Sequence, residues 1–200
     1  MSLGNLLGLY KIKNKFKIKG NYYISVGNIR PHKNIKTLLQ AFEILKNTEE
    51  TNEELIIAGD VDASLGNNYR EKLLEDINKN KYKKYIKRLG HVSKEDLTIL
   101  LGGAIALVHP SLFEGFGLTP LEAMACSTPV ISSKAASLPE VVKDAALMFD
   151  PLNTKALSEK MQIILTNKAL RNALIKKGIK RVKSFSWEKS AQTLYKSLKK

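Results

Sequence analysis

The sequence has one cysteine, no long apolar run and few acidic residues, and each shortage excludes a class of protein. A single Cys126 excludes an internal disulfide framework and, without a His or Cys cluster near it, a thiolate metal site. The longest apolar run, residues 104–108, has the length of a strand and falls far short of the ~20 residues that span a bilayer. No charged segment followed by an apolar one opens the chain. We therefore expect a protein that is not secreted and that works in a reducing cytoplasm.

The shortage of acidic residues leaves a strongly basic protein, with 33 Lys and Arg against 19 Asp and Glu and a net charge of +14. A field of this sign attracts nucleic acid, anionic membrane surface or phosphorylated ligands. The excess is spread over residues 11–19, 79–88 and 196–200, without a nucleic-acid motif or an aromatic ladder among them. We expect no nucleic-acid partner, and peripheral association with the inner face of the membrane stays open.

The order of apolar patterns predicts one α/β domain. A chain of 200 residues suits one domain better than two, and we place it at residues 20–200, with residues 1–19 as an initiator and linker segment outside the fold. Strand patterns alternate with helical ones, which predicts a Rossmann-like, doubly wound parallel sheet with helices on both faces. The strands are expected at residues 21–27, 54–60, 86–90, 104–110, 129–133 and 146–150, and the helices at 34–45, 68–80, 93–103, 118–126, 154–165, 168–183 and from 187 onward.

Ligands of such sheets bind beyond the carboxyl ends of the strands, so the loops that follow strands are the candidate site. In the first loop, GNIRPHKN, Gly27 permits a tight turn, and Arg30, His32 and Lys33 gather positive charge. Asn34 can cap the helix that follows. This combination suits a diphosphate, and the alternative is a loop that merely carries surface charge.

A second loop, HPSLFEGFG, joins a buried strand to a helix whose first N–H groups favour an anion. Gly115 and Gly117 remove side chains where a ligand comes close. Glu114 could accept hydrogen bonds from sugar hydroxyls, and Glu122 from a ribose diol. Acidic residues that merely stabilise a helix start are one alternative, and a glycosidase pair of carboxylates is another. His109 suits internal packing as well as ligand contact.

Taken together, these segments resemble a known family. Glu114 and Glu122 form an E-x7-E motif within EGFGLTPLEAMACSTPVISS, flanked in order by VGNIRPHKN, HPS, ASLPEVV and DAALMFDP. The set is similar to the retaining glycosyltransferases of the glycosyltransferases group 1 family, of the glycogen-synthase and mannosyltransferase type, over residues 20–200. The resemblance implies a GT-B fold, in which this chain is the C-terminal, nucleotide-sugar-binding half. On this resemblance, the N-terminal half, which usually holds most of the acceptor site, is expected to lie outside this sequence.

The resemblance also implies roles for residues. Glu114 would contact the donor sugar, Glu122 the ribose, and Lys33 the diphosphate. The base would lie near residues 59–63 and 90–92. The family commonly has an arginine directly after the loop glycine, where this sequence has Asn28, and the charge of Arg30 would replace it. The other residues expected to bind the substrate, several through backbone N–H groups, are Gly27, Gly115, Phe116, Gly117 and Leu118.

The implied reaction needs no metal and no cofactor. Lys33, Arg30 and the helix N-terminus would stabilise charge on the departing nucleoside diphosphate. Configuration would be retained by a front-face reaction in which Glu114 positions the sugar. The expected partners are a nucleotide-diphosphate sugar and, through the missing half, a glycan or lipid-linked acceptor of the cell envelope. The fragment alone is expected to be inactive.

Two alternatives stay open. One is a nucleotide-sugar epimerase of the same fold, which needs an acid and a base beside the sugar C2, and we find no such pair. The other is a non-catalytic basic module whose binding weakens steeply with salt. Phe185 and Trp187, before and in the final helix, are interpreted as core or interdomain packing and not as a stacking platform.

Overall fold

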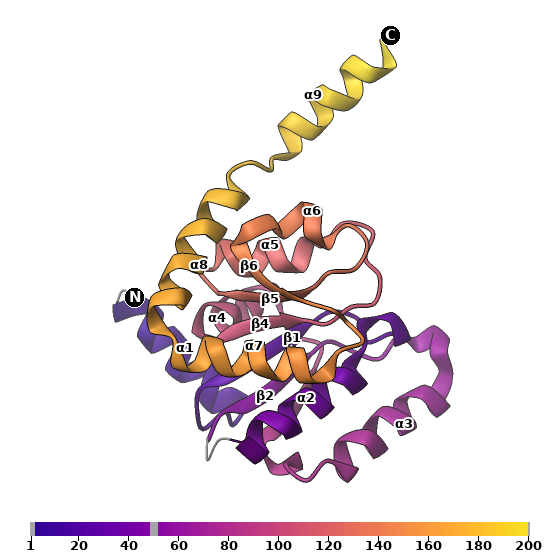
Figure 1. Ribbon diagram of the computed structural model, residues 1–200, viewed down its shortest axis with the longest axis vertical. Helices are drawn as coiled ribbons and strands as arrows, with labels where there is room; N and C mark the ends of the chain where they lie inside the picture. The colour runs from indigo at the N-terminus through magenta and orange to yellow at the C-terminus, as the bar shows by residue number, and fades with distance from the viewer. Residues whose placement is uncertain (1–2, 49–51, 200) are drawn as a thin grey trace.

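The computed structural model describes residues 3–48 and 52–199, and within them six strands form one parallel sheet (Figure 1). The order across the sheet is β3-β2-β1-β4-β5-β6. This confirms the predicted doubly wound α/β fold. The strands are β1 (Tyr22–Val26), β2 (Glu54–Ala58), β3 (Ile86–Gly90), β4 (Ala106–His109), β5 (Val130–Ser133) and β6 (Ala146–Phe149).

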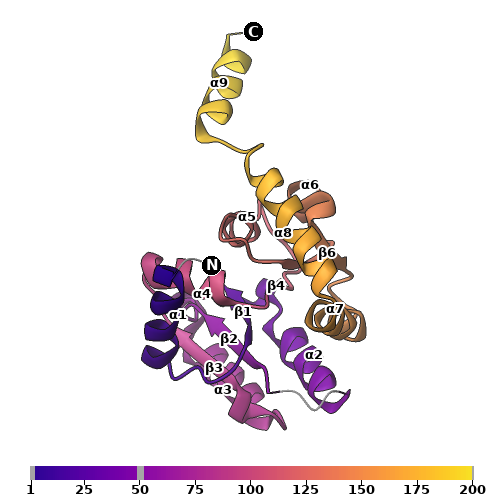
Figure 2. The ribbon, with the colours of Figure 1, turned by 90° about the vertical axis from the view of Figure 1, so that its left-hand side faces the viewer.

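Helices cover both faces of the sheet, with α1, α4 and α5 on one side and α2 and α7 on the other (Figure 2). The helices are α1 (Leu3–Lys15), α2 (Ile35–Thr48), α3 (Gly66–Lys79), α4 (Lys94–Gly103), α5 (Leu118–Ala125), α6 (Leu138–Val142), α7 (Thr154–Thr166), α8 (Lys168–Val182) and α9 (Trp187–Leu198). Short 3-10 turns lie at η1 (Pro31–Lys33), η2 (Ala63–Leu65), η3 (Lys83–Tyr85) and η4 (Lys143–Ala145).

Two neighbouring tyrosines of β1 show how the strand alternation builds both layers. Successive side chains of a strand point to opposite faces, so Tyr22 and Tyr23 enter different core clusters, and both are fully buried. Burial raises the pKa of both phenols, which therefore remain protonated and donate hydrogen bonds. Tyr22 donates to the carbonyl of Leu100 in α4, and Tyr23 to that of Met161 in α7, each at 2.8 Å.

The strand order places the candidate loops side by side. The chain runs outward from β1 through β2 to β3, returns to β4 on the other side of β1, and continues to β5 and β6. The order therefore reverses between β1 and β4, which is the point where such sheets bind ligands. The loops after β1 and β4, residues 27–34 and 110–117, both leave the carboxyl ends of these adjacent strands.

The beginning of the chain differs from our expectation, because residues 3–15 form α1, which packs against α4. Ile12 and Ile18 are buried in the core cluster that lies between the sheet and the helices α4 and α5. Leu9 lies over Gly103, whose missing side chain leaves room for it: a Cβ there would come within 2.3 Å of Leu9 Cδ1. Lys15 pairs with Asp96 of α4. Residues 3–15 therefore belong to the domain.

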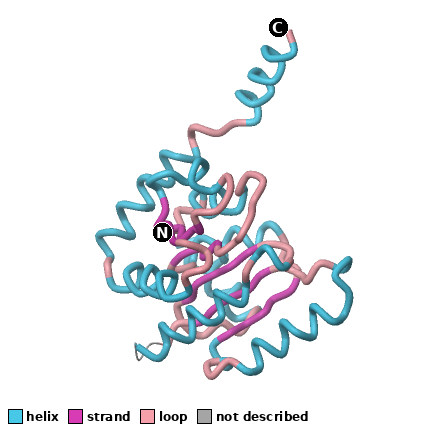
Figure 3. Tube along the Cα trace, turned by 45° about the vertical axis from the view of Figure 1, so that its right-hand side comes forward, coloured by secondary structure: helices cyan, strands magenta, loops and turns pink. Residues whose placement is uncertain are grey.

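The last helix, α9, stands clear of the rest of the chain beyond the loop that follows α8 (Figure 3). Its apolar side chains are exposed, with Trp187 at 82%. Trp187 is thus outside the core of this chain, whereas Phe185 packs against the cluster around α5. Across residues 3–48 and 52–199, no helix combines the length and the apolar character needed to cross a membrane.

The buried position of Ile12 in α1 predicts the contribution of this helix to stability. We expect Ile12→Ala to lower the free energy of unfolding by about 2–4 kcal/mol, because it opens a cavity between α1 and the sheet. Leu7→Ala, in the same helix but 54% exposed, is the matched control and is expected to change it by less than about 1 kcal/mol. Urea denaturation measures both. Equal effects would contradict the packing of α1 described above.

Candidate functional site

The loops after β1 and β4 are joined directly. The backbone N–H of Leu112 donates to the carbonyl of His32 at 2.7 Å. Asn34 precedes the first residue of α2, and its side-chain amide reaches two further loops. It donates to the carbonyl of Pro110 at 3.1 Å and to that of Pro151, after β6, at 2.9 Å. These bonds hold the loops after β1, β4 and β6 in one arrangement.

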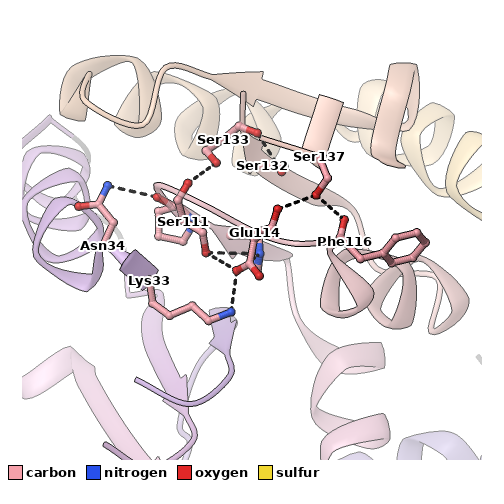
Figure 4. A network of polar contacts seen from close by, with 10 residues as sticks. Lys33, Asn34, Ser111, Glu114, Phe116, Ser132, Ser133 and Ser137 are labelled. Carbon is pink, nitrogen blue, oxygen red and sulfur yellow. Dashed lines mark hydrogen bonds and ion pairs between the residues drawn. The ribbon is translucent and has the colours of Figure 1, made fainter. Parts of the chain in front are cut away.

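At the centre of the site, one carboxylate oxygen gathers several donors (Figure 4). Oε1 of Glu114 lies 2.6 Å from Nζ of Lys33, 2.7 Å from Oγ of Ser111 and 3.0 Å from Nε2 of His109. Lys33 comes from the loop after β1, and the other residues come from β4 and its loop. The side chains of Lys33 and Glu114 are 17% and 15% exposed, so the pair is shielded yet reachable from solvent.

The surroundings of Glu114 keep it ionised. Burial alone would raise its pKa, but hydrogen bonds from His109, Lys33 and Ser111 outweigh burial and hold the pKa well below its ordinary value. His109 is buried, and burial lowers the pKa of its ring despite the opposing effect of Glu114. The imidazole is therefore neutral at pH 7, and its contact with the carboxylate requires the proton on Nε2. The site contains one cation, Lys33, beside one carboxylate.

Two glycines give the loops their shape. Gly27 has φ +135°, and a Cβ there would lie 3.4 Å from Cε and Nζ of Lys33, in the space that the lysine crosses to reach Glu114. Gly117 has φ +104°, and a Cβ there would come within 2.8 Å of Leu138 Cδ2. Gly117 also precedes α5 and offers no side chain to cap it. The first N–H groups of α5 therefore have no side-chain cap from Gly117. They lie at the carboxyl end of the strands, directly after the loop that carries Glu114.

Arg30 does not join this centre. Its guanidinium pairs with the Asp62 carboxylate in the loop after β2, with Nε donating at 2.7 Å. Hydrogen bonds from the side chain and backbone of Ser64, and then from Arg30, lower the pKa of Asp62 to about 2, so the pair is ionised at neutral pH. Asn28 is exposed on the same loop. Of the two cations expected to act together, the structure brings only Lys33 to Glu114.

The remaining predicted residues lie on the loop and helix after Glu114. Glu122 is exposed in the second turn of α5, apart from the contacts around Lys33. Phe116 and Leu118 are 45% and 51% exposed, and Phe116 packs edge-to-face on Phe185 with ring centroids 5.8 Å apart. In the described part of the chain, no group of three or more His, Cys, Asp or Glu side chains is placed to hold a metal ion.

The structure adds serines that sequence reasoning missed. Besides Ser111, these are Ser133, whose Oγ donates to the Ser111 carbonyl at 2.5 Å, and Ser137, whose Oγ lies 2.9 Å from the carbonyls of both Glu114 and Phe116. Ser133 and Ser137 belong to the end of β5 and the loop after it (Figure 4). Ser111 could have been found from its place in the HPS segment, but nothing local to the sequence indicates that the other two reach the loop after β4.

The low pKa of Glu114 predicts a pH dependence of stability. A glutamate titrates near about 4.3 in an unfolded chain, so the stabilisation by Glu114 is complete above that pH and is lost as pH falls toward the lower folded-state pKa. We expect the free energy of unfolding, measured with urea from about pH 7 to about pH 3, to decrease less steeply in Glu114→Gln than in the wild type. Glu122→Gln, which removes an exposed carboxylate, is the control and should keep the wild-type slope. Equal slopes for wild type and Glu114→Gln would contradict the ionised Glu114.

The sequence and the fold of this chain are similar to those of known glycosyltransferases. O-antigen chain mannosyltransferase B of Escherichia coli is 37% identical over 171 residues, which cover 84% of this chain and 42% of that protein. Anabaena Alr3699/HepE, solved in complex with UDP and glucose, superposes with a TM-score of 0.85 at 19% identity, over 100% of this chain and 53% of its own. The C-terminal domain of a glycosyl transferase group 1 family protein (LpcC) of Francisella tularensis superposes with a TM-score of 0.75 at 21% identity, covering 87% of this chain and 90% of its own.

The chain therefore spans less than half the length of the mannosyltransferase it matches and nearly all of an isolated C-terminal domain. The family model for glycosyl transferases group 1 matches residues 9–181. That match begins inside α1 and ends at the last turn of α8, so it includes both loops of the candidate site. This chain belongs to the glycosyl transferases group 1 family.

Proposed function

We propose that this chain is the donor-binding domain of a glycosyltransferase and holds the diphosphate of a nucleotide sugar between Lys33 and the N-terminus of α5. The observation that carries the proposal is the placement of Lys33 Nζ, 2.6 Å from Glu114 at the point where the strand order reverses. An ammonium group and free helical N–H groups both favour an anion. The adjacent carboxylate suits the hydroxyls of the sugar that the diphosphate carries.

The same geometry suits departure of the nucleoside diphosphate. Negative charge grows on the leaving phosphate as the glycosidic bond breaks, and a cation already fixed beside it stabilises that charge without reorganisation. In the domain described here, Lys33 is paired with Glu114, so a bound diphosphate would share or take over the ammonium group. Glu114, freed in part from Lys33 but still bonded to Ser111 and His109, would orient the sugar. Glu122, exposed on α5, would bind the ribose hydroxyls.

We also infer the setting of the whole enzyme. The lengths of the relatives support a second, N-terminal half that supplies the acceptor site, because this chain spans 42% of the mannosyltransferase and 53% of HepE. The O-antigen mannosyltransferase among the relatives supports transfer of a hexosyl group to a glycan or lipid-linked acceptor. We place the reaction in the cytoplasm, with peripheral association at the inner face of the membrane, in keeping with the net charge of +14. Transfer is with retention of configuration, and this domain alone is inactive.

Binding of the donor is the first test. We expect calorimetric titration with UDP, GDP, ADP and their sugar conjugates to give saturable binding to one base. Lys33→Ala should weaken it about tenfold or more, because a charge-assisted hydrogen bond to phosphate is lost. Glu122→Ala should weaken it as well, through the lost ribose contact. Lys36→Ala is the matched control for charge, since Lys36 lies exposed on α2 close in sequence to Lys33, and it should bind as the wild type does.

Equal losses in Lys33→Ala and Lys36→Ala would show attraction by general charge and would contradict the proposed diphosphate site. Binding that ignores the nucleotide and disappears steeply with added salt would instead favour the basic, non-catalytic module.

Stereochemistry tests the proposed reaction. We expect the complete enzyme that contains this chain to form a product with the anomeric configuration of the donor sugar. The one-bond C1–H1 coupling of the transferred sugar, measured by NMR on the first product formed, distinguishes the two anomers. A product of inverted configuration would contradict retaining transfer while leaving donor binding by this domain intact.

A further inference from the structure

The loop between β5 and α6 contacts the turn that carries Glu114, although neither the predicted chemistry nor the family motif assigns it a role. The hydroxyl of Ser137 lies 2.9 Å from the carbonyl oxygen of Glu114 and 2.9 Å from that of Phe116 (Figure 4). These carbonyls flank Gly115. A hydroxyl has one proton to donate, so Ser137 shares it between two acceptors on either side of this glycine.

The position of Ser137 makes this bond unusual. Ser137 is the residue before the first turn of α6, where a serine side chain normally accepts a hydrogen bond from a backbone N–H of its own helix. In the described structure, Ser137 makes no such capping bond, and its hydroxyl points to the loop after β4. Ala136, just before it, has φ +47°, a left-handed conformation that is unfavourable for a residue with a Cβ. The loop thus keeps an unfavourable backbone conformation at the residue that leads into Ser137.

Further contacts from the same segment support the turn. Leu138 lies against Gly117, where a side chain would come within 2.8 Å of it. Ser133, at the end of β5, donates to the carbonyl of Ser111 at 2.5 Å. The end of β5 and its loop therefore contact the loop after β4 near its beginning, at its middle and at its end.

Gly115, in contrast, is exposed, and a Cβ there would have no atom within 4 Å. A glycine has no Cβ to restrict its backbone dihedrals, and nothing packs over this position. The bonds to the Glu114 side chain fix the carboxylate, but they do not fix the backbone between Glu114 and Gly117, which leads to the first N–H groups of α5. Ser137 bonds directly to that backbone, on both sides of Gly115.

We propose that Ser137 is a positioning residue of the donor site. Its hydroxyl holds the backbone from Glu114 to Phe116, so that the Glu114 carboxylate and the N-terminus of α5 face the same ligand. This inference rests on the proposed donor-binding function. Ser137 acts through the loop and does not itself contact the ligand. The loop between β5 and α6 thereby acquires a role in the site.

The test compares three variants of the full 200-residue chain. Ser137→Ala removes the hydroxyl, and Ser137→Thr retains it. Thr128→Val is the structural control: Thr128 donates from Oγ1 to the Leu101 carbonyl at 2.6 Å, at the opposite end of α5 from the site. Affinity for UDP, GDP and ADP is measured by calorimetry, thermal stability by the unfolding midpoint, and mobility by hydrogen exchange of the amides of residues 115–117 without ligand.

We expect Ser137→Ala to weaken nucleoside diphosphate binding about three- to tenfold, as fits the loss of one partly buried hydrogen bond, and to speed exchange of these amides. Ser137→Thr should restore both, and Thr128→Val should lower the unfolding midpoint without changing either. Unchanged affinity and exchange in Ser137→Ala, or a threonine variant as impaired as the alanine one, would overturn the role of Ser137. Absence of nucleotide binding by the wild type would contradict the proposed function itself. Unchanged amide exchange in Ser137→Ala would separately overturn the role of Ser137.

Discussion

The arrangement of the site depends on the convergence of Lys33, Ser111 and His109 on one oxygen of Glu114. A carboxylate that is partly buried must be compensated, and here the compensation comes from two loops that are far apart in sequence and adjacent only because β1 and β4 are neighbours in the sheet. The ion pair between Lys33 and Glu114 thereby fixes how the loops approach one another. It also keeps a positive charge at the reversal point of the strand order, where a doubly wound sheet receives its ligand.

The net charge of +14 contributes little to this local chemistry. Arg30, the second cation expected at the site, is neutralised by Asp62, and many of the other lysines lie in α1, around η3 and in α9, away from the carboxyl ends of β1 and β4. A cavity lined by Lys19, Lys84 and Lys87 lies at the opposite end of the sheet, but Lys87 there faces the buried carboxylate of Glu54. In the proposed function, selectivity for a diphosphate would thus depend on Lys33, which is shielded, and on the N–H groups that begin α5, while the surface charge acts over longer distances.

Much of the fold could be predicted from the sequence because buried parallel strands are short apolar runs with turn residues at their ends. Both loops of the site could also be predicted, since they follow such strands and carry Gly27, Lys33 and Glu114. The helix before residue 20 could not be predicted. Ile12 and Phe16 have helical spacing, but lysines alternate with the apolar residues there and weaken the amphipathic pattern. Ser137 was missed for a different reason. A serine before Leu-Pro-Glu is typical of a helix cap, and only the packing of α6 beside α5 turns its hydroxyl toward the neighbouring loop.

The most direct measurement is a crystal structure of this chain with the nucleoside diphosphate that binds it most tightly. The account predicts that the diphosphate lies between Nζ of Lys33 and the backbone N–H groups of residues 116–118, with the ribose toward Glu122 and the Lys33–Glu114 distance longer than the 2.6 Å described above. A diphosphate bound in the cavity of Lys19, Lys84 and Lys87, with the Lys33–Glu114 pair unchanged, would contradict it.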